Sequence, residues 1–304
     1  MKLYVGVTDT SWYELLKEEQ HDEANFWRPG SSSFKAINEN EMFLFKLHSP
    51  NDYIVGGGFF VKYLTIPTYL AWEAYGTKNG AKSLTELNDK IGKYRKSNNI
   101  DTNPMIGCIL LTDVFYFDKE DWIPVPSDWS KSIVQGKTYD SETLAGRKLY
   151  NDVLDRLQAK NILHDQQEDI TARYTESVTK HRLGQSAFRV LVTEAYQNRC
   201  AITGERTLPV LQAAHIKSYA SNGPHAVDNG ILLKSDFHTL YDVGYLTIDT
   251  DYRVNVSPRL HADYDNGKDY YKYHGQKLLI LPNNVNQLPS KEYLEWHNEN
   301  VYLG

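Results

Sequence analysis

The stretch from Cys200 to Gly244 constrains the fold of this chain more than any other feature of its sequence. Val210–Ile216 is an apolar run that closes on a histidine, and Gly230–Leu233 is a second, shorter apolar run. Ser235 is a good N-cap for a helix of two turns, and Gly244 is a natural terminator beyond the end of that helix. We therefore predict a ββα unit, in which strand, loop, strand and short helix follow one another.

The polar residues of this unit suit the hydrolysis of a phosphodiester. That reaction needs a base that deprotonates water, a cation beside the scissile phosphate and help for the departing oxygen. His215, at the end of the first strand, can act as a general base near neutral pH. His238 and Asp242 are four residues apart, so both lie on one face of the helix and can hold one divalent ion. Asn229 leads into the second strand and can orient the imidazole of His215 by a hydrogen bond.

The order His215, Asn229 and His238, with His238 nine residues after the asparagine, resembles the HNH (ββα-metal) endonuclease family. The resemblance implies that His215 is the general base, that Asn229 is its orienting residue and that His238 is a metal ligand. Asp242 occupies the place where nuclease colicins carry a second metal-binding histidine on the helix. The implied cofactor is one divalent ion per active site, either Mg²⁺ or a transition metal such as Mn²⁺ or Ni²⁺.

Two positions depart from the family pattern. Many HNH enzymes carry an acidic or histidine ligand immediately before the base, where this chain has Ala214. Either Asp242 or Asp236 replaces that ligand, or the metal site is weak. Many members also have a zinc knuckle of paired cysteines, of which only Cys200 remains, with Thr203 at its partner's position. Apolar packing can hold such a knuckle together without zinc.

Taken singly, these residues also have ordinary structural explanations. A lone histidine on a strand is usually structural, Asn229-Gly230 by itself is a turn signal, and the helix dipole alone accounts for Asp236. We expect His225 and Asp228, in the loop before Asn229, to be solvated. The nuclease prediction therefore depends on the joint order, spacing and element type of the residues.

Composition limits the class of protein. The 304 residues are enough for two domains, and the two cysteines are too few for a disulfide framework, which predicts a reducing cytoplasm. We find neither an amino-terminal signal nor an apolar run that could span a bilayer, so we expect no membrane association. The net charge of -6 disfavours non-specific binding to nucleic acid, although local basic runs can supply a DNA surface. Taken alone, each of two basic runs favours a solvated helix face; they are Lys78, Lys82, Lys90, Lys93, Arg95 and Lys96, and Arg173, Lys180, His181, Arg182, Arg189 and Arg199.

The first 140 residues alternate short apolar runs with turn signals, which predicts a small α+β, barrel-like domain with inserted helices. The expected strands are Lys2–Val7, Met42–Leu47, Tyr53–Val55, Phe59–Leu64, Ile106–Leu111 and Val114–Phe117. The expected helices are Trp12–Glu19, Thr68–Tyr75 and Leu84–Tyr94. From Ser141, a plausible N-cap, the pattern becomes helical. We thus predict a DNA-sensing domain at 1–140, a helical linker at 141–180 that bridges the two parts, and a nuclease domain at 181–304.

The first part is similar to the PUA-like superfamily, the EVE, ASCH and SRA-type modules, several of which bind modified or flipped bases. The residues that carry this similarity are Leu3–Asp9, Trp12, Asn25–Trp27, Phe43–Leu47 and Val55–Phe60. A flipped base needs aromatic faces for stacking and polar groups for its Watson–Crick edge. The candidate substrate-binding residues are Trp12, Trp27, Phe59 and Trp72 for the faces, with Asp9, Asn25 and His48 as polar partners. The alternative for any one of these aromatic residues is that it packs in the core. Gly56–Gly58 either allows a close approach of the backbone to DNA or makes a bulge.

The segments on either side of the ββα unit, Arg182–Arg189, Val256–Leu260 and Ile280–Pro282, resemble predicted restriction endonucleases of the HNH class. We therefore predict a metal-dependent, modification-dependent (type IV-like) restriction endonuclease that recognises modified cytosine in double-stranded DNA by base flipping. A double-strand break needs two such sites, so we expect a homodimer. Two alternatives stay open: an HNH restriction or nicking enzyme that reads unmodified DNA, and a DNA-binding protein whose nuclease has decayed at Ala214.

Overall fold

The structure is a computed structural model that describes residues 1–95, 101, 103–159 and 183–304. The chain divides into two compact units, Met1–His181 and Arg182–Gly304, each with its own hydrophobic clusters. Lys96 and the basic residues Arg173, Lys180, His181 and Arg182 lie outside the described residues. No helix within the described ranges is long and apolar enough to cross a membrane.

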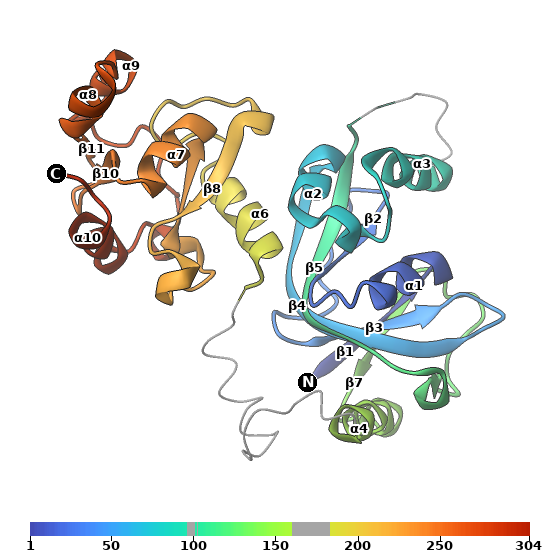
Figure 1. The fold of residues 1–304 in the computed structure, drawn as a ribbon. Coiled ribbons are helices and arrows are strands. Elements are labelled where there is room, and N and C mark those ends of the chain that lie inside the picture. Colours follow the sequence, from blue (N-terminus) through green and yellow to red (C-terminus); the bar gives the residue numbers. More distant parts are fainter. Residues whose placement is uncertain (96–100, 102, 160–182) are drawn as a thin grey trace. The chain divides into compact units, whose positions relative to one another are not determined.

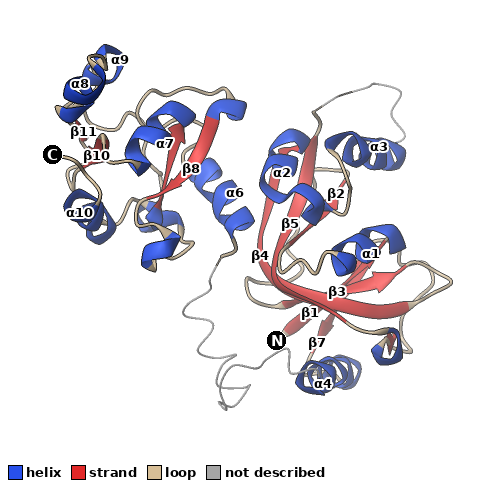
Figure 2. Cartoon of the chain, viewed as in Figure 1, coloured by secondary structure: helices blue, strands red, loops and turns tan. Residues whose placement is uncertain are grey.

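A seven-stranded sheet organises the first unit (Figures 1 and 2). Its strands are β1 (Lys2–Thr8), β2 (Ala24–Arg28), β3 (Met42–Leu47), β4 (Tyr53–Pro67), β5 (Met105–Tyr116), β6 (Ile123–Pro124) and β7 (Gly136–Asp140). The order is β2-β5-β4-β3-β1-β7, with β6 paired to β4, and only β1 and β3 run parallel. The predicted α+β class is confirmed, although among the described strands the ladder is open between β2 and β7 rather than closed as a barrel. A side-chain hydrogen bond from Arg28 Nη2 to Gln135 Oε1 (2.7 Å) nevertheless links β2 to the residue before β7.

Two pairs of strands predicted as separate are single long strands. Gly56–Gly58 lies inside β4 and does not break it, although the register against β5 shifts between Gly57 and Phe59. A Cβ at Gly56 would lie 2.3 Å from Phe115 O, so glycine is needed for the close approach of the neighbouring strand. The predicted break is therefore wrong, whereas the register shift beside Gly57 agrees with the alternative of a bulge.

The helices of the first unit cover both faces of the sheet. They are α1 (Thr10–Glu18), α2 (Thr68–Tyr75), α3 (Leu84–Arg95) and α4 (Leu144–Ala159), with the short 3-10 turns η1 (Gly76–Asn79) and η2 (Lys119–Asp121). Successive side chains of β3 point to opposite faces, so Phe43 and Phe45 join one cluster while Met42 and Leu44 join the other. The sheet is therefore buried on both faces.

The helix expected in the linker belongs to the first unit. Leu149, Val153 and Leu157 of α4 are buried in the cluster that contains Leu3 of β1. The helix begins three residues later than predicted, and Thr143 rather than Ser141 supports its first turn, since Thr143 Oγ1 accepts from Gly146 N at 3.1 Å. Over its described length this segment is thus a packed element of the unit, and residues 160–182 lie outside the described residues.

The second unit is built around the predicted ββα motif. β8 (Leu211–His215) and β9 (Gly230–Lys234) form an antiparallel pair in which His215 faces Gly230, and α7 (Ser235–Asp242) follows directly. Lys234 rather than Ser235 is the N-cap residue, and Gly244 ends the helix region with φ +84°. The surrounding elements are α6 (Gln185–Ala195), β10 (Leu246–Ile248), β11 (Val254–Val256), α8 (Arg259–Tyr264), α9 (Lys268–Tyr271), α10 (Lys291–Asn300) and the 3-10 turns η4 (Leu208–Val210), η5 (Tyr219–Ser221), η6 (Val227–Asn229) and η7 (Val285–Gln287).

Candidate active site and base pocket

His215 sits at the end of β8 in a space that a glycine creates. Gly230 is its register partner, and a Cβ there would lie 2.4 Å from Val192 Cγ2 and 3.0 Å from ring atoms of Phe188. Because residue 230 has no side chain, Phe188 of α6 reaches the imidazole of His215 and stacks on it, with centroids 4.0 Å apart and planes 11° apart. One face of the predicted base is therefore covered by an aromatic ring.

The protonation state of His215 suits a base. Burial, with smaller contributions from the neighbouring His225 and His238, lowers the pKa of His215 to about 4. The imidazole is consequently neutral at physiological pH and carries a lone pair that can accept a proton.

Asn229 has a different role from the one we predicted. Its side chain is fully buried, and its three hydrogen bonds go to main-chain atoms of the preceding loop. Oδ1 accepts from Lys217 N (2.9 Å), while Nδ2 donates to Lys217 O (2.9 Å) and to Pro224 O (2.8 Å). The expected bond to the imidazole of His215 is not the one that this side chain makes: both hydrogens of Nδ2 and one lone pair of Oδ1 are used by the loop, so Asn229 fixes the shape of residues 217–224.

The loop between β8 and β9 supplies a residue that sequence reasoning missed. His225 was expected to be solvated, yet its Nδ1 lies 2.9 Å from Nε2 of His215. Its ring also stacks on Tyr219, with centroids 4.7 Å apart and planes 10° apart. Asp228, also expected in solvent, is partly buried, and burial raises the pKa of its carboxyl.

His238 and Asp242 meet on α7 as their spacing predicts. His238 Nε2 lies 3.2 Å from Asp242 Oδ2, and His238 Nδ1 lies 2.8 Å from Gln212 Oε1. An amide oxygen only accepts, so the neutral form of His238 that donates from Nδ1 to Gln212 has the lone pair of Nε2 on the side of Asp242. Burial raises the pKa of Asp242, and the charge of His238 opposes that rise. No motif pointed to Gln212, which lies two residues before Ala214 and on the same side of β8.

These donors fit a divalent ion held by two protein ligands. An imidazole nitrogen beside a carboxylate oxygen is a donor set that first-row transition metals accept well. Asp236 is not part of this pair: it lies about 200° around the helix from His238, and its Oδ2 accepts from Lys234 Nζ at 3.3 Å. Ala214 is fully buried and offers no donor. Within the described ranges, no cluster of three or more histidine, cysteine or acidic side chains is placed to hold a metal.

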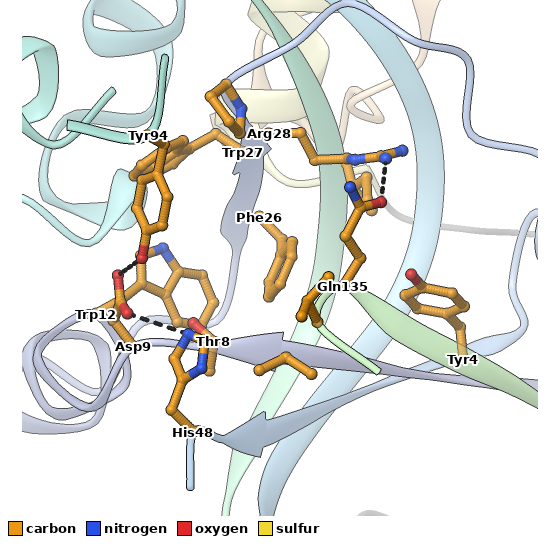
Figure 3. A pocket seen from close by; sticks show the side chains of 14 residues that line it. Tyr4, Thr8, Asp9, Trp12, Phe26, Trp27, Arg28, His48, Tyr94 and Gln135 are labelled. Atoms are coloured by element: carbon orange, nitrogen blue, oxygen red, sulfur yellow. Dashed lines mark hydrogen bonds and ion pairs between the residues drawn. The ribbon is translucent and has the colours of Figure 1, made fainter. Parts of the chain in front are cut away.

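A cavity of about 420 Å³ opens in the first unit (Figure 3). Four of the seven predicted substrate-binding residues line it, namely Asp9, Trp12, Trp27 and His48. The other three do not: Asn25 is buried and donates to Asn79 Oδ1 (2.8 Å), Phe59 packs with the cluster on the opposite face of the sheet, and Trp72 is partly buried on α2. Alternation along β4 places Phe59 on the face opposite Phe60, and the bond to Asn79 holds Asn25 in the interior.

The cavity is polar at two opposite sides and apolar between them, as Figure 3 shows. On one side Asp9 accepts from Tyr94 Oη (2.7 Å) and lies 3.3 Å from His48 Nε2. Burial and the bond to Asp9 raise the pKa of Tyr94 to about 12, so its hydroxyl stays neutral. On the other side stand Arg28 and Gln135. Sequence reasoning missed Tyr94 and Gln135, which come from segments distant in the sequence, and Arg28, although it directly follows the predicted Trp27 on β2.

With this geometry established, comparisons with known proteins identify the class of the second unit. Residues 200–249 match the family described as HNH endonuclease, and this segment contains β8, β9 and α7. The chain therefore carries an HNH endonuclease domain, which makes it a DNA-cleaving hydrolase. Among curated proteins no match is found.

Several solved structures are similar to this chain at low identity. ASCH from Zymomonas mobilis is 12% identical over 49% of this chain and 94% of its own, with a TM-score of 0.33. The modification-dependent TagI restriction endonuclease is 12% identical over 92% of this chain and 75% of its own, with a TM-score of 0.28. The type IV phosphorothioation-dependent restriction endonuclease ScoMcrA is 14% identical over 78% of this chain and 46% of its own, with a TM-score of 0.21.

Proposed function

We propose that this endonuclease depends on DNA modification: the cavity of the first unit accepts a modified cytosine flipped out of the duplex, and the HNH domain cuts the DNA. The observation that carries the proposal is a cavity with aromatic walls and polar groups at both sides, in a chain that also contains a nuclease site. A volume of about 420 Å³ falls within the roughly 300–1,000 Å³ typical of small-ligand sites.

The polar groups of the cavity match the edge of cytosine. Cytosine presents an amino donor at N4 and acceptors at N3 and O2. The Asp9 carboxylate accepts, and so complements the amino group, whereas the Arg28 guanidinium donates, and so complements the acceptors. Phe26 and Trp27 line the apolar part of the cavity, where the face of the base would stack.

The chemistry at the HNH site follows from the protonation states described above. His215 is neutral and accepts a proton from water, and the attacking oxygen then forms a bond to phosphorus. Phe188 keeps one face of the imidazole away from solvent. A divalent ion held by His238 and Asp242 would supply positive charge near the phosphate. We propose His215 as the catalytic base, Asn229 as a positioning residue and His238 with Asp242 as the metal ligands.

The test is cleavage of one plasmid in three states: unmethylated, cytosine-methylated and hydroxymethylated. Each is incubated with Mg²⁺ and with Mn²⁺, and variant H215A reports the contribution of the HNH site. Variant D9N changes the cavity, with D89N on an exposed face of α3 as its matched control. We expect cutting of a modified state only, lost in H215A and reduced in D9N. Equal cutting of all three states would refute the dependence on modification and leave the nuclease.

We further propose that a homodimer makes double-strand breaks, because one HNH site cuts one strand. Sedimentation velocity in the presence of modified duplex tests this. A dimeric complex and linear plasmid product are expected, whereas a monomer that produces linear plasmid in one binding event would refute it.

A further inference from the structure

We propose that His225 is a positioning residue for the HNH reaction: it holds His215 in the tautomer that leaves Nδ1 free to accept the proton of water. The inference rests on the proposed function, in which His215 is the base. It arises from the 2.9 Å contact between His215 Nε2 and His225 Nδ1.

The contact limits the protons of the two rings to two arrangements. Two ring nitrogens at 2.9 Å share one hydrogen, so one donates and the other accepts. If His215 donates from Nε2, its Nδ1 keeps a lone pair and can act as the base; if His225 donates, the proton of neutral His215 is on Nδ1 and the base is blocked. A productive site thus requires His225 to be the acceptor, with its own proton on Nε2.

The same bond helps the reaction once the proton has moved. The O–H bond of water breaks, its proton goes to Nδ1 of His215, and its oxygen bonds to phosphorus while the bond to the leaving oxygen breaks. The leaving oxygen takes its proton from solvent. His215 is then an imidazolium whose Nε2–H donates to His225, and a charge-assisted bond is stronger than a neutral one. Orientation by a third group is the general requirement for such bases.

The surroundings hold the two rings in this arrangement. Phe188 stacks on His215, and Tyr219 stacks on His225. The two imidazole planes meet at 59°, with centroids 5.0 Å apart. Each ring is therefore fixed by an aromatic neighbour as well as by the hydrogen bond, and the titratable groups that face His215 are His225 and His238.

The loop that carries His225 is anchored beside it. Asn229 Nδ2 donates to the carbonyl of Pro224, the residue immediately before His225. Gly223 allows a close turn there, since a Cβ would lie 1.9 Å from Lys217 O. Asn229 therefore acts on the base through the loop and His225, rather than by touching the imidazole of His215.

Two substitutions of His225 test its hydrogen-bond acceptor and its aromatic ring separately. In H225F the ring can still stack on Tyr219, but no acceptor remains. In H225N an amide oxygen stands near the place of Nδ1, so the acceptor is retained without the ring. Variant H261F changes an exposed histidine of α8 and serves as the matched control. Circular dichroism and DNA affinity are measured for each variant to establish that the fold and binding are intact.

We expect H225F to cut modified plasmid about 10- to 100-fold more slowly, the usual effect of losing a partner that orients a functional histidine. H225N should regain most of the rate, and H261F should equal the unaltered protein. Nitrogen-15 NMR of histidine-labelled full-length protein gives a second readout: His215 should carry its proton on Nε2, and this preference should be lost in H225F and kept in H225N.

Full activity of H225F would overturn the inference, as would equal loss in H225F and H225N with the tautomer of His215 unchanged. If the unaltered protein cuts none of the plasmids, the proposed function fails, whereas the NMR readout still decides whether His225 sets the tautomer. A proton found on Nδ1 of His215 in the unaltered protein would overturn the inference in either case.

Discussion

Replacing Asn229 by alanine should detach the loop that carries His225 while leaving the rest of the HNH domain folded. The Asn229 side chain is fully buried, and its amide makes three hydrogen bonds, to both main-chain groups of Lys217 and to the carbonyl of Pro224. Alanine makes none of them. The loop then loses the side-chain bonds that join Lys217 and Pro224 to residue 229, whereas the main-chain bonds of residue 229 to Ile216 and Ala226 remain.

The size of the effect follows from those bonds. A typical internal hydrogen bond contributes a net stability of about 1 kcal/mol, so three contribute about 3 kcal/mol. For a unit of this size, a loss of that order lowers Tm by roughly 10 °C. Because the displaced loop carries the partner of His215, we also expect cleavage to fall about 10- to 100-fold. Asn229→Asp should be no better, because a carboxylate cannot donate to two carbonyls.

The assay combines thermal unfolding of the full chain, hydrogen exchange at the Lys217 amide and plasmid cleavage. Asn222→Gly is the matched control, since Asn222 is exposed in the same loop and has a positive φ of 62° that glycine adopts freely. The control should keep both Tm and rate. An Asn229→Ala protein with unchanged Tm and unchanged exchange at Lys217 would refute the proposed role of the amide.

Three further outcomes are expected. Asp242→Ala should weaken Mn²⁺ binding at least about tenfold by calorimetry; an unchanged Kd would remove Asp242 from the ligand set. Gly230→Ala should cost about 1–3 kcal/mol in denaturant unfolding, because its Cβ lies 2.4 Å from Val192 Cγ2, and Val192→Ala should relieve that cost; no cost would contradict the close contact. Burial lowers the pKa of His297 to about 4. Between pH ~6.5 and 4 this histidine is therefore protonated in the unfolded chain but neutral in the folded chain. Stability should therefore be lost as pH falls from about 6.5 to 4, by at most ~3 kcal/mol, and an equal loss in His297→Gln would exclude this cause.

Local pattern was a good guide where the contacts are local. The ββα unit could be predicted because periodicity and turn residues act over a few positions, and the pairing of His238 with Asp242 followed from helical geometry alone. The helices α1, α2 and α3 were predicted within about two residues at each end for the same reason. Strand ends were less accurate, because Gly56–Gly58 reads as a break until the neighbouring β5 is present to pair with it.

The candidate sites needed contacts that pattern does not contain. His225 comes from a loop with no periodicity, and the loop anchored by Asn229 and the ring contact with Tyr219 place it beside His215. In the first unit, Tyr94 and Gln135 reach the cavity from elements far from Asp9 in the sequence. Two of the predicted aromatic residues, Phe59 and Trp72, do not line the cavity, because an aromatic side chain suits a core as well as a pocket by its type alone; Asn25 is instead buried and bonded to Asn79.

The amino-acid sequence by itself determined the class of chemistry, since the identity, order and spacing of His215, Asn229 and His238 are properties of one short segment. Tertiary structure decided which atom each of those side chains faces. In the packed unit the side chain of Asn229 bonds to the main chain of the loop, and His225 lies beside His215. Only four of the seven predicted substrate-binding residues line the cavity. The physical reason is that a hydrogen bond or a stack depends on positions set by the whole packed unit, whereas helical and strand periodicity depend only on neighbours along the chain.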